Sequence, residues 1–243
     1  MNVLDLDLDF FLNDVVTLPY DIRPDSKIYK PWNEDDVVNF LEMNCNLSKE
    51  SKIPGQIVTT HDEVFYIWRD LIASEELNQP FNVTHIDAHA DLGMGDASFI
   101  TICTDIVHRT LLDRFDPPNK GHSGIYEGNY LAYALACRWI SKLTYVRNPK
   151  TRNDLLPIYF KDQDINSGLI RIPKYDPAVA GNMFLDKVEP VGFEPDIEFQ
   201  SSLPTDFQIK SEFDFMFLAK SPKYTPPEAD TLVDVIQEYI DLF

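Results

Sequence analysis

The segment HIDAHADL, residues 85–92, follows an apolar stretch that begins at Phe81 and carries two histidines and two aspartates. Asp87, His89 and Asp91 occupy alternate positions, and side chains at this spacing on an extended chain point the same way. Two carboxylates and an imidazole that face one point repel each other, or lose solvation, unless a cation lies between them. The segment therefore predicts a metal site at the end of a buried strand.

Three further aspartates alternate with apolar residues at the start of the chain. In VLDLDLDFF, residues 3–11, one face of the predicted strand carries Asp5, Asp7 and Asp9, with neighbours about 7 Å apart. An edge strand whose acidic face meets water would explain this pattern, because charged side chains hinder an exposed edge strand from pairing with another chain. The flanking apolar residues and the second carboxylate-rich strand end favour instead a buried strand whose aspartates help to bind metal.

The remaining histidines differ in their expected roles. His61 lies in VTTHDEVFYIW, residues 58–68, where a strand passes into a helix. Because the carboxyl ends of strands face the ligand crevice in open α/β sheets, His61 is expected to meet Asp87 there. A simpler alternative is that His61 or Asp62 caps the helix. His85 lies inside the apolar strand, which indicates a supporting role, and His108 is expected to be structural within a helix.

Alternating strand and helix patterns predict a mostly parallel sheet with helices on both faces, a three-layer αβα arrangement. Strands are expected at 2–9, 56–60, 82–87, 143–146 and 213–219, and helices at 34–43, 62–75, 104–115, 128–141 and 228–241. Residues 147–212 are expected to run over one end of the sheet, with strands in LPIYF and LIRIP, and such excursions commonly build binding sites. No boundary divides the chain, so residues 1–243 are expected to form one α/β domain.

Composition limits the classes of partner. The chain has 243 residues and a net charge of −19, which should repel nucleic acid and anionic membranes and leaves a small molecule as the expected partner. The N-terminus lacks the pattern of a signal peptide, and no apolar run approaches the ~20 residues of a membrane span. Three cysteines without a CxxC pair support neither a disulfide framework nor a zinc ribbon, and fit a reducing cytoplasm.

These motifs carry a family resemblance. DAHAD at 87–91 resembles the motif of the ureohydrolase superfamily (arginase, agmatinase and formiminoglutamase), whose fold is shared with histone deacetylases. LDLDLDFF is similar to the second aspartate-rich strand of that superfamily. The chain also resembles, more narrowly, an uncharacterised protein family within the superfamily. This resemblance rests on the combination of DLDFF, HIDAHADL and the C-terminal SPKYTPPEADTLVDVI. The matched segments cover about a fifth of the chain.

The resemblance implies a site with two metal ions. Asp87 would bridge both metals and His89 would bind one of them. Asp91 and His61 would bind the other, because His61 matches the histidine that opens the helix after an early strand of the superfamily.

Two of the three N-terminal aspartates would complete the site. The position nearer the carboxyl end of the strand favours Asp7 and Asp9, whereas the superfamily alignment equally allows Asp5 and Asp7. Mostly oxygen ligands with one or two imidazoles suit Mn²⁺ best, and Zn²⁺ or Fe²⁺ also fit the ligand types.

The chain departs from the superfamily pattern in several places. The aspartate strand precedes DAHAD instead of following it, as in a circularly permuted chain, which moves a connection without moving the strand. EGNYLAYAL retains Gly128 and Asn129 but lacks the proton-shuttling histidine that follows in ureohydrolases, so His122 in KGHSG is the candidate replacement. LAKSP places Lys220 and Ser221 where a guanidinium-binding glutamate is expected, which argues against arginine and for an anionic substrate.

The expected chemistry is hydrolysis of a non-peptide C–N bond in an amide or amidine by a metal-activated water. A nearby histidine would protonate the leaving amine. One alternative is a non-catalytic protein that keeps the cation for stability. Another is a deacetylase-like enzyme with a single zinc bound by Asp87, His89 and one aspartate of the first strand.

Overall fold

The computed structural model of the protein describes residues 1–117, 124–180 and 188–243. Within these ranges the strands are β1 (Asn2–Asp7), β2 (Ile53–Val58), β3 (Phe81–Asp87), β4 (Ile140–Arg147), β5 (Leu169–Ile170), β6 (Pro173–Lys174), β7 (Gly192–Phe193), β8 (Ile197–Ser202), β9 (Phe215–Ala219) and β10 (Ile240–Leu242). The α-helices are α1 (Glu34–Asn39), α2 (Glu63–Ala73), α3 (Ser98–Thr104), α4 (Tyr130–Ala136) and α5 (Asp230–Gln237).

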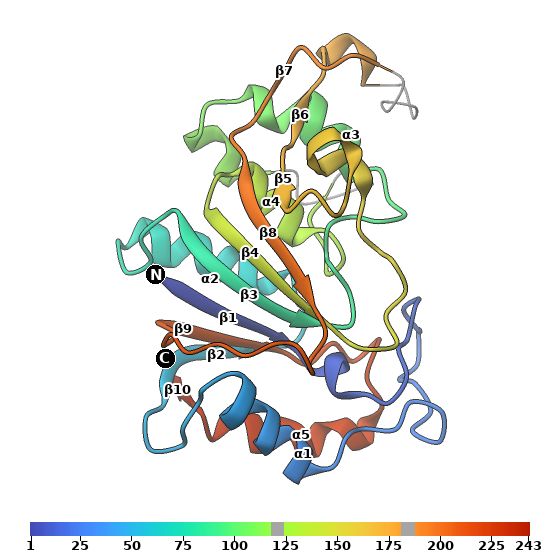
Figure 1. The fold of residues 1–243 in the computed structure, drawn as a ribbon, viewed down its shortest axis with the longest axis vertical. Coiled ribbons are helices and arrows are strands. Elements are labelled where there is room, and N and C mark those ends of the chain that lie inside the picture. Colours follow the sequence, from blue (N-terminus) through green and yellow to red (C-terminus); the bar gives the residue numbers. More distant parts are fainter. Residues whose placement is uncertain (118–123, 181–187) are drawn as a thin grey trace.

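Eight of the described strands form one sheet in the order β10-β2-β9-β1-β3-β4-β8-β5. Every neighbouring pair in it is parallel except β5 and β8, which are antiparallel. Strands β6 and β7 form a separate antiparallel pair. Figure 1 shows the sheet running through the molecule, with helices above and below it. The predicted mostly parallel α/β sheet with three αβα layers is confirmed.

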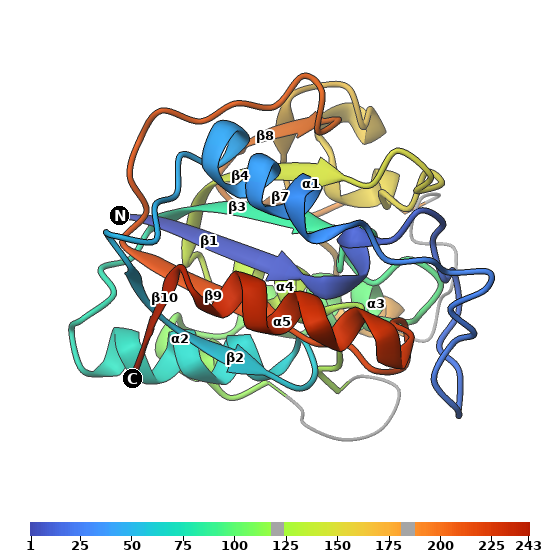
Figure 2. The same ribbon diagram turned by 90° about the horizontal axis from the view of Figure 1, so that it is seen from below.

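The two faces of the sheet bury separate apolar clusters. One face packs against α2, α3 and α4, whose buried side chains include Trp68 and Tyr133. The other packs against α1 and α5 through residues such as Val37, Leu232 and Ile236. Figure 2 shows α1 and α5 lying across that second face. Burial on both faces explains why β9, with the sequence FMFLA, is apolar throughout.

Strand β1 lies near the middle of the sheet, between β9 and β3. Leu4 and Leu6 belong to the cluster under α1 and α5. The alternation along a strand therefore turns Asp5 and Asp7 toward the face covered by α2 and α4, and both are buried. The alternative of a water-facing edge strand for this segment is wrong.

Some expected elements are wrong. The helix expected at 104–115 is replaced by α3, which ends at Thr104, and by 3₁₀ turns at Ile106–His108 and Leu112–Phe115. The buried Arg114 guanidinium donates to the Val107 carbonyl, 2.7 Å away, and so occupies an acceptor that a continuing helix would use. The expected strand LPIYF contains instead a 3₁₀ turn at Pro157–Tyr159, because proline fixes its own φ and has no N–H for a ladder.

Other boundaries shift. Arg138 has φ of 60°, which ends α4 and turns the chain into β4 at Ile140, before the expected end of that helix at 141. The sequence pattern does not predict β7, β8 or β10, and β10 occupies the end of the predicted closing helix. Within the described ranges, no helix combines the length and the apolar character needed to cross a bilayer.

Candidate metal centre

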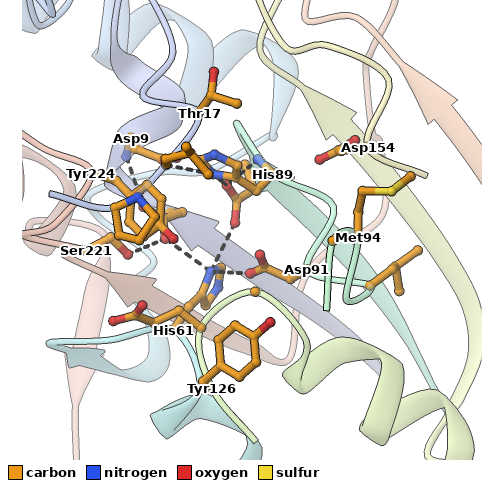
Figure 3. A pocket seen from close by; sticks show the side chains of 18 of the residues that line it. Asp9, Thr17, His61, His89, Asp91, Met94, Tyr126, Asp154, Ser221 and Tyr224 are labelled. Carbon is orange, nitrogen blue, oxygen red and sulfur yellow. Dashed lines mark hydrogen bonds and ion pairs between the residues drawn. The ribbon is translucent and has the colours of Figure 1, made fainter. Parts of the chain in front are cut away.

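Carboxylates and imidazoles gather at the carboxyl edge of the sheet. Asp7 ends β1, Asp87 ends β3, and His61 lies between the end of β2 and the start of α2. Carboxyl ends of parallel strands meet at one edge, so three segments far apart in sequence bring their ligands together. The predicted convergence is confirmed, and Figure 3 shows His61, His89 and Asp91 around one cavity.

One group of ligand atoms surrounds the His61 ring. Its Nδ1 atom lies 3.2 Å from Asp7 Oδ2, 3.0 Å from Asp87 Oδ2 and 3.2 Å from the Oδ2 atom of Asp91. His61 Nδ1 and Asp87 Oδ2 are both buried and have no hydrogen-bond partner in the described part of the chain. Four potential ligands therefore face one point, and the atoms at its centre are unsatisfied.

Asp5 lies beneath this group and supports it. The Nε2 atom of His61 is 3.0 Å from Asp5 Oδ1, and His85 Nδ1 is 2.9 Å from Asp5 Oδ2. The phenol of Tyr130 donates to the same carboxylate. When the Nε2 proton of a neutral His61 faces Asp5, the lone pair of Nδ1 is directed toward Asp7, Asp87 and Asp91. Asp5 acts as the partner that fixes this tautomer, as carboxylates do behind metal-binding histidines.

A second group forms around His89. His89 Nδ1 lies 3.0 Å from Asp9 Oδ2 and 3.7 Å from Asp87 Oδ1, and its Nε2 atom lies 3.0 Å from the Val16 carbonyl. Donation to that carbonyl leaves Nδ1 free to bind a cation. The two groups share Asp87, which presents one oxygen to each, and each can hold a metal ion.

The backbone around the ligands departs from the expected extended conformation. Strand β3 ends at Asp87, so His89 and Asp91 lie on a turn, and the expectation that all three share an extended strand is wrong. Asp91 has φ of 50° and Ser221 has φ of 45°. Positive φ is costly for residues other than glycine and is typically retained at functional sites. Ser221 Oγ donates to Asp7 Oδ2, so this strained serine orients a candidate ligand.

Burial and neighbouring charges shift the pKa values of the residues in the cluster. Burial, helped by the charge of Asp87, raises the pKa of Asp91 to about 7. Burial also raises the pKa of Asp9 well above its usual range, with Asp7 and Asp87 adding to the effect. Burial alone would lower the pKa values of His61 and His89, but the surrounding acidic groups outweigh it and raise both. Without a cation, the cluster therefore holds protons that its residues would release in water.

Metal-free protein should lose stability as the pH rises from about 5 to about 8. The raised pKa of Asp91, about 7 against a usual 3.8, contributes stability that is present at low pH and lost through neutrality. The raised pKa values of His61 and His89 act in the same direction above 6.5. A metal needs deprotonated ligands, so the melting-temperature gap between Mn²⁺-treated and chelator-treated protein should widen with pH. A constant gap would contradict a metal bound by these residues.

The ligands line a cavity of about 520 Å³. Leu18 and Met94 at its rim are exposed, so the cavity reaches solvent. Tyr224 packs beside His89, with ring centroids 4.9 Å apart. The sequence did not indicate Tyr224 or the loop 152–154, although SPKYTPP places Tyr224 three residues after Ser221, close to a predicted site residue.

The other predicted site residues lie in different places. Asn129 is buried, and its side chain bonds Tyr126 N, Asp96 and the Gly124 carbonyl, so it holds the loop before α4. Ser221 lines the cavity, whereas Lys220 lines a neighbouring cavity that contains Asp230 and Asp234. The two residues expected to bind substrate together are thus separated. His122 lies outside the described residues.

His85 and His108 both contact backbone carbonyl groups of described residues. His85 is fully buried against Asp5, and its Nε2 atom lies 3.1 Å from the His89 carbonyl, which links the strand to the metal-binding turn. His108 lies in a 3₁₀ turn, not in an α-helix, and its Nε2 atom is 2.7 Å from the Tyr175 carbonyl.

Fold and site together define an α/β protein with a buried aspartate and histidine cluster that can hold a divalent metal ion. No protein-family model matches the chain, and no curated protein matches it. The resemblance to ureohydrolases therefore rests on the motif residues alone.

Proposed function

We propose that the protein is a metal-dependent hydrolase of a non-peptide C–N bond in an amide or amidine. The observation that carries the proposal is the pair formed by His61 Nδ1 and Asp87 Oδ2, which lie 3.0 Å apart, buried and without hydrogen-bond partners in the described chain. An unsatisfied buried polar atom costs about 1–3 kcal/mol, and more when charged. A cation between these atoms removes that cost and leaves a ligand set suited to hydrolysis.

The ligand chemistry supports two ions. The group of His61, Asp7, Asp87 and Asp91 would hold one, and the group of Asp9, Asp87 and His89 would hold the other. Asp87 would bridge them, as the ureohydrolase resemblance implies. Carboxylate oxygens predominate in both groups, which favours Mn²⁺, while Zn²⁺ and Fe²⁺ remain compatible with the ligand types.

The resemblance also fits the placement of β1. In ureohydrolases the aspartate strand follows DAHAD, whereas here it opens the chain and pairs with β3, the strand that leads into DAHAD. A change in connection that leaves the strand beside its partner keeps the ligands together. The order of the motifs is therefore no objection to the proposal.

Bound divalent ions would supply a nucleophile at neutral pH and polarise the reacting carbonyl or amidine carbon. The chain itself would position the ligands: Ser221 orients Asp7, and the Val16 carbonyl orients His89. Tyr224 lines the cavity, and because burial raises the pKa of its phenol it stays protonated and can donate to a developing oxyanion. His122 remains the proposed donor of a proton to the leaving amine.

Elemental analysis tests the proposal first, on protein purified without chelator and without a metal affinity column. We expect bound Mn²⁺, Fe²⁺ or Zn²⁺ approaching two ions per chain, and release of ammonia, urea or amine from a panel of amides and guanidino compounds. His61→Ala should abolish both. Asp35→Asn is the control, because Asp35 is exposed on α1, on the opposite face of the sheet.

The alternatives give different results. One zinc per chain with amide hydrolysis would indicate the deacetylase-like enzyme. Bound metal without turnover of any compound in the panel would indicate the non-catalytic protein. Absence of metal after reconstitution with all three ions would overturn the proposal.

A further inference from the structure

A second cavity, of about 630 Å³, lies beside the metal centre at the carboxyl ends of β4 and β8. Tyr145 and Arg147 reach it from β4, and Ser201 and Ser202 reach it from β8. The cavity shares residues 152–154 of the loop after β4 with the cavity of the metal centre. Two adjoining pockets therefore open at the same edge of the sheet.

The arginines of this cavity differ from all others in the chain. Arg147 and Arg152 line the cavity, and neither forms an ion pair or a side-chain hydrogen bond with another described residue. The other arginines pair with carboxylates; they are Arg23, Arg69, Arg109, Arg114, Arg138 and Arg171. In a protein with net charge −19, acidic partners are abundant. Arg147 is partly buried and Arg152 is exposed at the mouth of the cavity. Two guanidinium groups in one cavity, both without a carboxylate partner among the described residues, indicate a binding site for an external anion.

Two hydroxyl groups of this cavity also favour an anionic ligand. The Tyr145 side chain is 1% exposed and lines the cavity, and its hydroxyl oxygen is buried without a hydrogen-bond partner in the described chain. The Ser202 hydroxyl is also buried and without such a partner. Hydroxyl donors and guanidinium groups that line one cavity suit the oxygens of a carboxylate or phosphate.

The acidic residues of the cavity do not neutralise the arginines. Asp154 Oδ2 accepts a 2.6 Å hydrogen bond from the Ala90 backbone, which turns it toward the metal-binding turn. Asp206 is exposed. Neither forms an ion pair with Arg147 or Arg152 within the described residues, so the guanidinium donors stay available.

We propose that this second cavity binds a carboxylate or phosphate group through Arg147, Arg152 and the Tyr145 hydroxyl. The binding site itself does not depend on the metal centre. A further step rests on the proposed function: the anion belongs to the substrate, whose scissile C–N bond reaches the metal centre past the shared loop 152–154. The substrate class is then an amide or amidine with an acidic group on the part remote from the bond that breaks.

Titration calorimetry with inorganic phosphate, and separately with acetate, tests the binding site on protein stripped of metal by chelator and dialysed. Removal of metal keeps either anion from binding at the metal centre. We expect saturable binding, with affinity lowered about tenfold or more by Arg147→Met and roughly fivefold by Tyr145→Phe. Preference for phosphate or for acetate identifies the acidic group.

Two variants serve as controls in this experiment. Tyr145→Phe removes one oxygen that has no internal partner, so it should weaken anion binding while leaving the melting temperature of the ligand-free protein equal or higher. Lys220→Met removes a cation from the neighbouring cavity and should leave anion affinity unchanged. Equal affinity in wild type, Arg147→Met and Tyr145→Phe, or no binding of either anion, would overturn the proposal. Because no metal is present, that failure is independent of the hydrolase assay.

Discussion

Asp91→Asn should stabilise the metal-free protein at about pH 8 and remove most of the stabilisation that metal provides. The pKa of Asp91 is raised to about 7, so its anion at pH 8 is held against burial and the charge of Asp87. Each pKa unit corresponds to about 1.4 kcal/mol, so removal of that charge relieves up to about 4 kcal/mol. Asparagine also tolerates the positive φ of this position well.

The metal-dependent effect should change in the opposite direction. A metal present at about 100 times its dissociation constant stabilises the folded state by about 2.7 kcal/mol, or roughly 5–10 °C in a chain of this size. Loss of a ligand weakens binding, so the shift between chelator and Mn²⁺ should shrink or vanish. Thermal melts in both conditions measure the two effects together, with Asp35→Asn as the exposed control. Asp91→Asn melts that keep the wild-type response to Mn²⁺ would show that Asp91 is no ligand.

The candidate site could be predicted from sequence because its ligands follow strand ends. HIDAHADL and the N-terminal alternation both place acidic residues at or just beyond the end of an apolar strand, and parallel strands bring such ends together. The expected period correctly placed Asp5 and Asp7 on the same side. The pattern does not show which of these aspartates reaches the cavity, because that depends on the residues that cover each one. Asp5 is covered by His61 and Tyr130, which come from other segments.

Other features depend on tertiary structure and leave no local pattern. The reversal of the chain at Ser221, with its positive φ, directs Ser221 to Asp7 and Lys220 to another cavity. The sequence pattern alone placed both residues at one rim. Arg147 also carries no sequence signal, because its lack of a carboxylate partner depends on residues distant in the chain. The sequence pattern predicts the end of a helix at β10, because the three residues of this strand, Ile240–Leu242, are too few to show a period of two.

Asp5→Asn should destabilise the protein whether or not metal is present. Asp5 is fully buried, and its carboxylate contacts His61, His85 and Tyr130. Burial alone would raise its pKa, but the two imidazoles outweigh burial and lower it, so the anion stabilises the fold above its usual pKa of 3.8. Removal of one partner from a buried charged network costs about 3–5 kcal/mol.

The same substitution should weaken metal binding about 10- to 100-fold, because an amide can turn its NH₂ group toward His61 and release the ring from the tautomer that exposes Nδ1. Chemical denaturation in chelator measures the loss of stability, and a Mn²⁺ titration measures the loss of affinity. Asp91→Asn is the matched comparison: both changes replace a buried aspartate by asparagine in one cluster. One is expected to raise metal-free stability and the other to lower it: at Asp91, burial and the charge of Asp87 outweigh the nearby His61 imidazole, whereas at Asp5 the two imidazoles outweigh burial. Metal-free Asp5→Asn protein as stable as wild type would show that the carboxylate does not hold these rings in place.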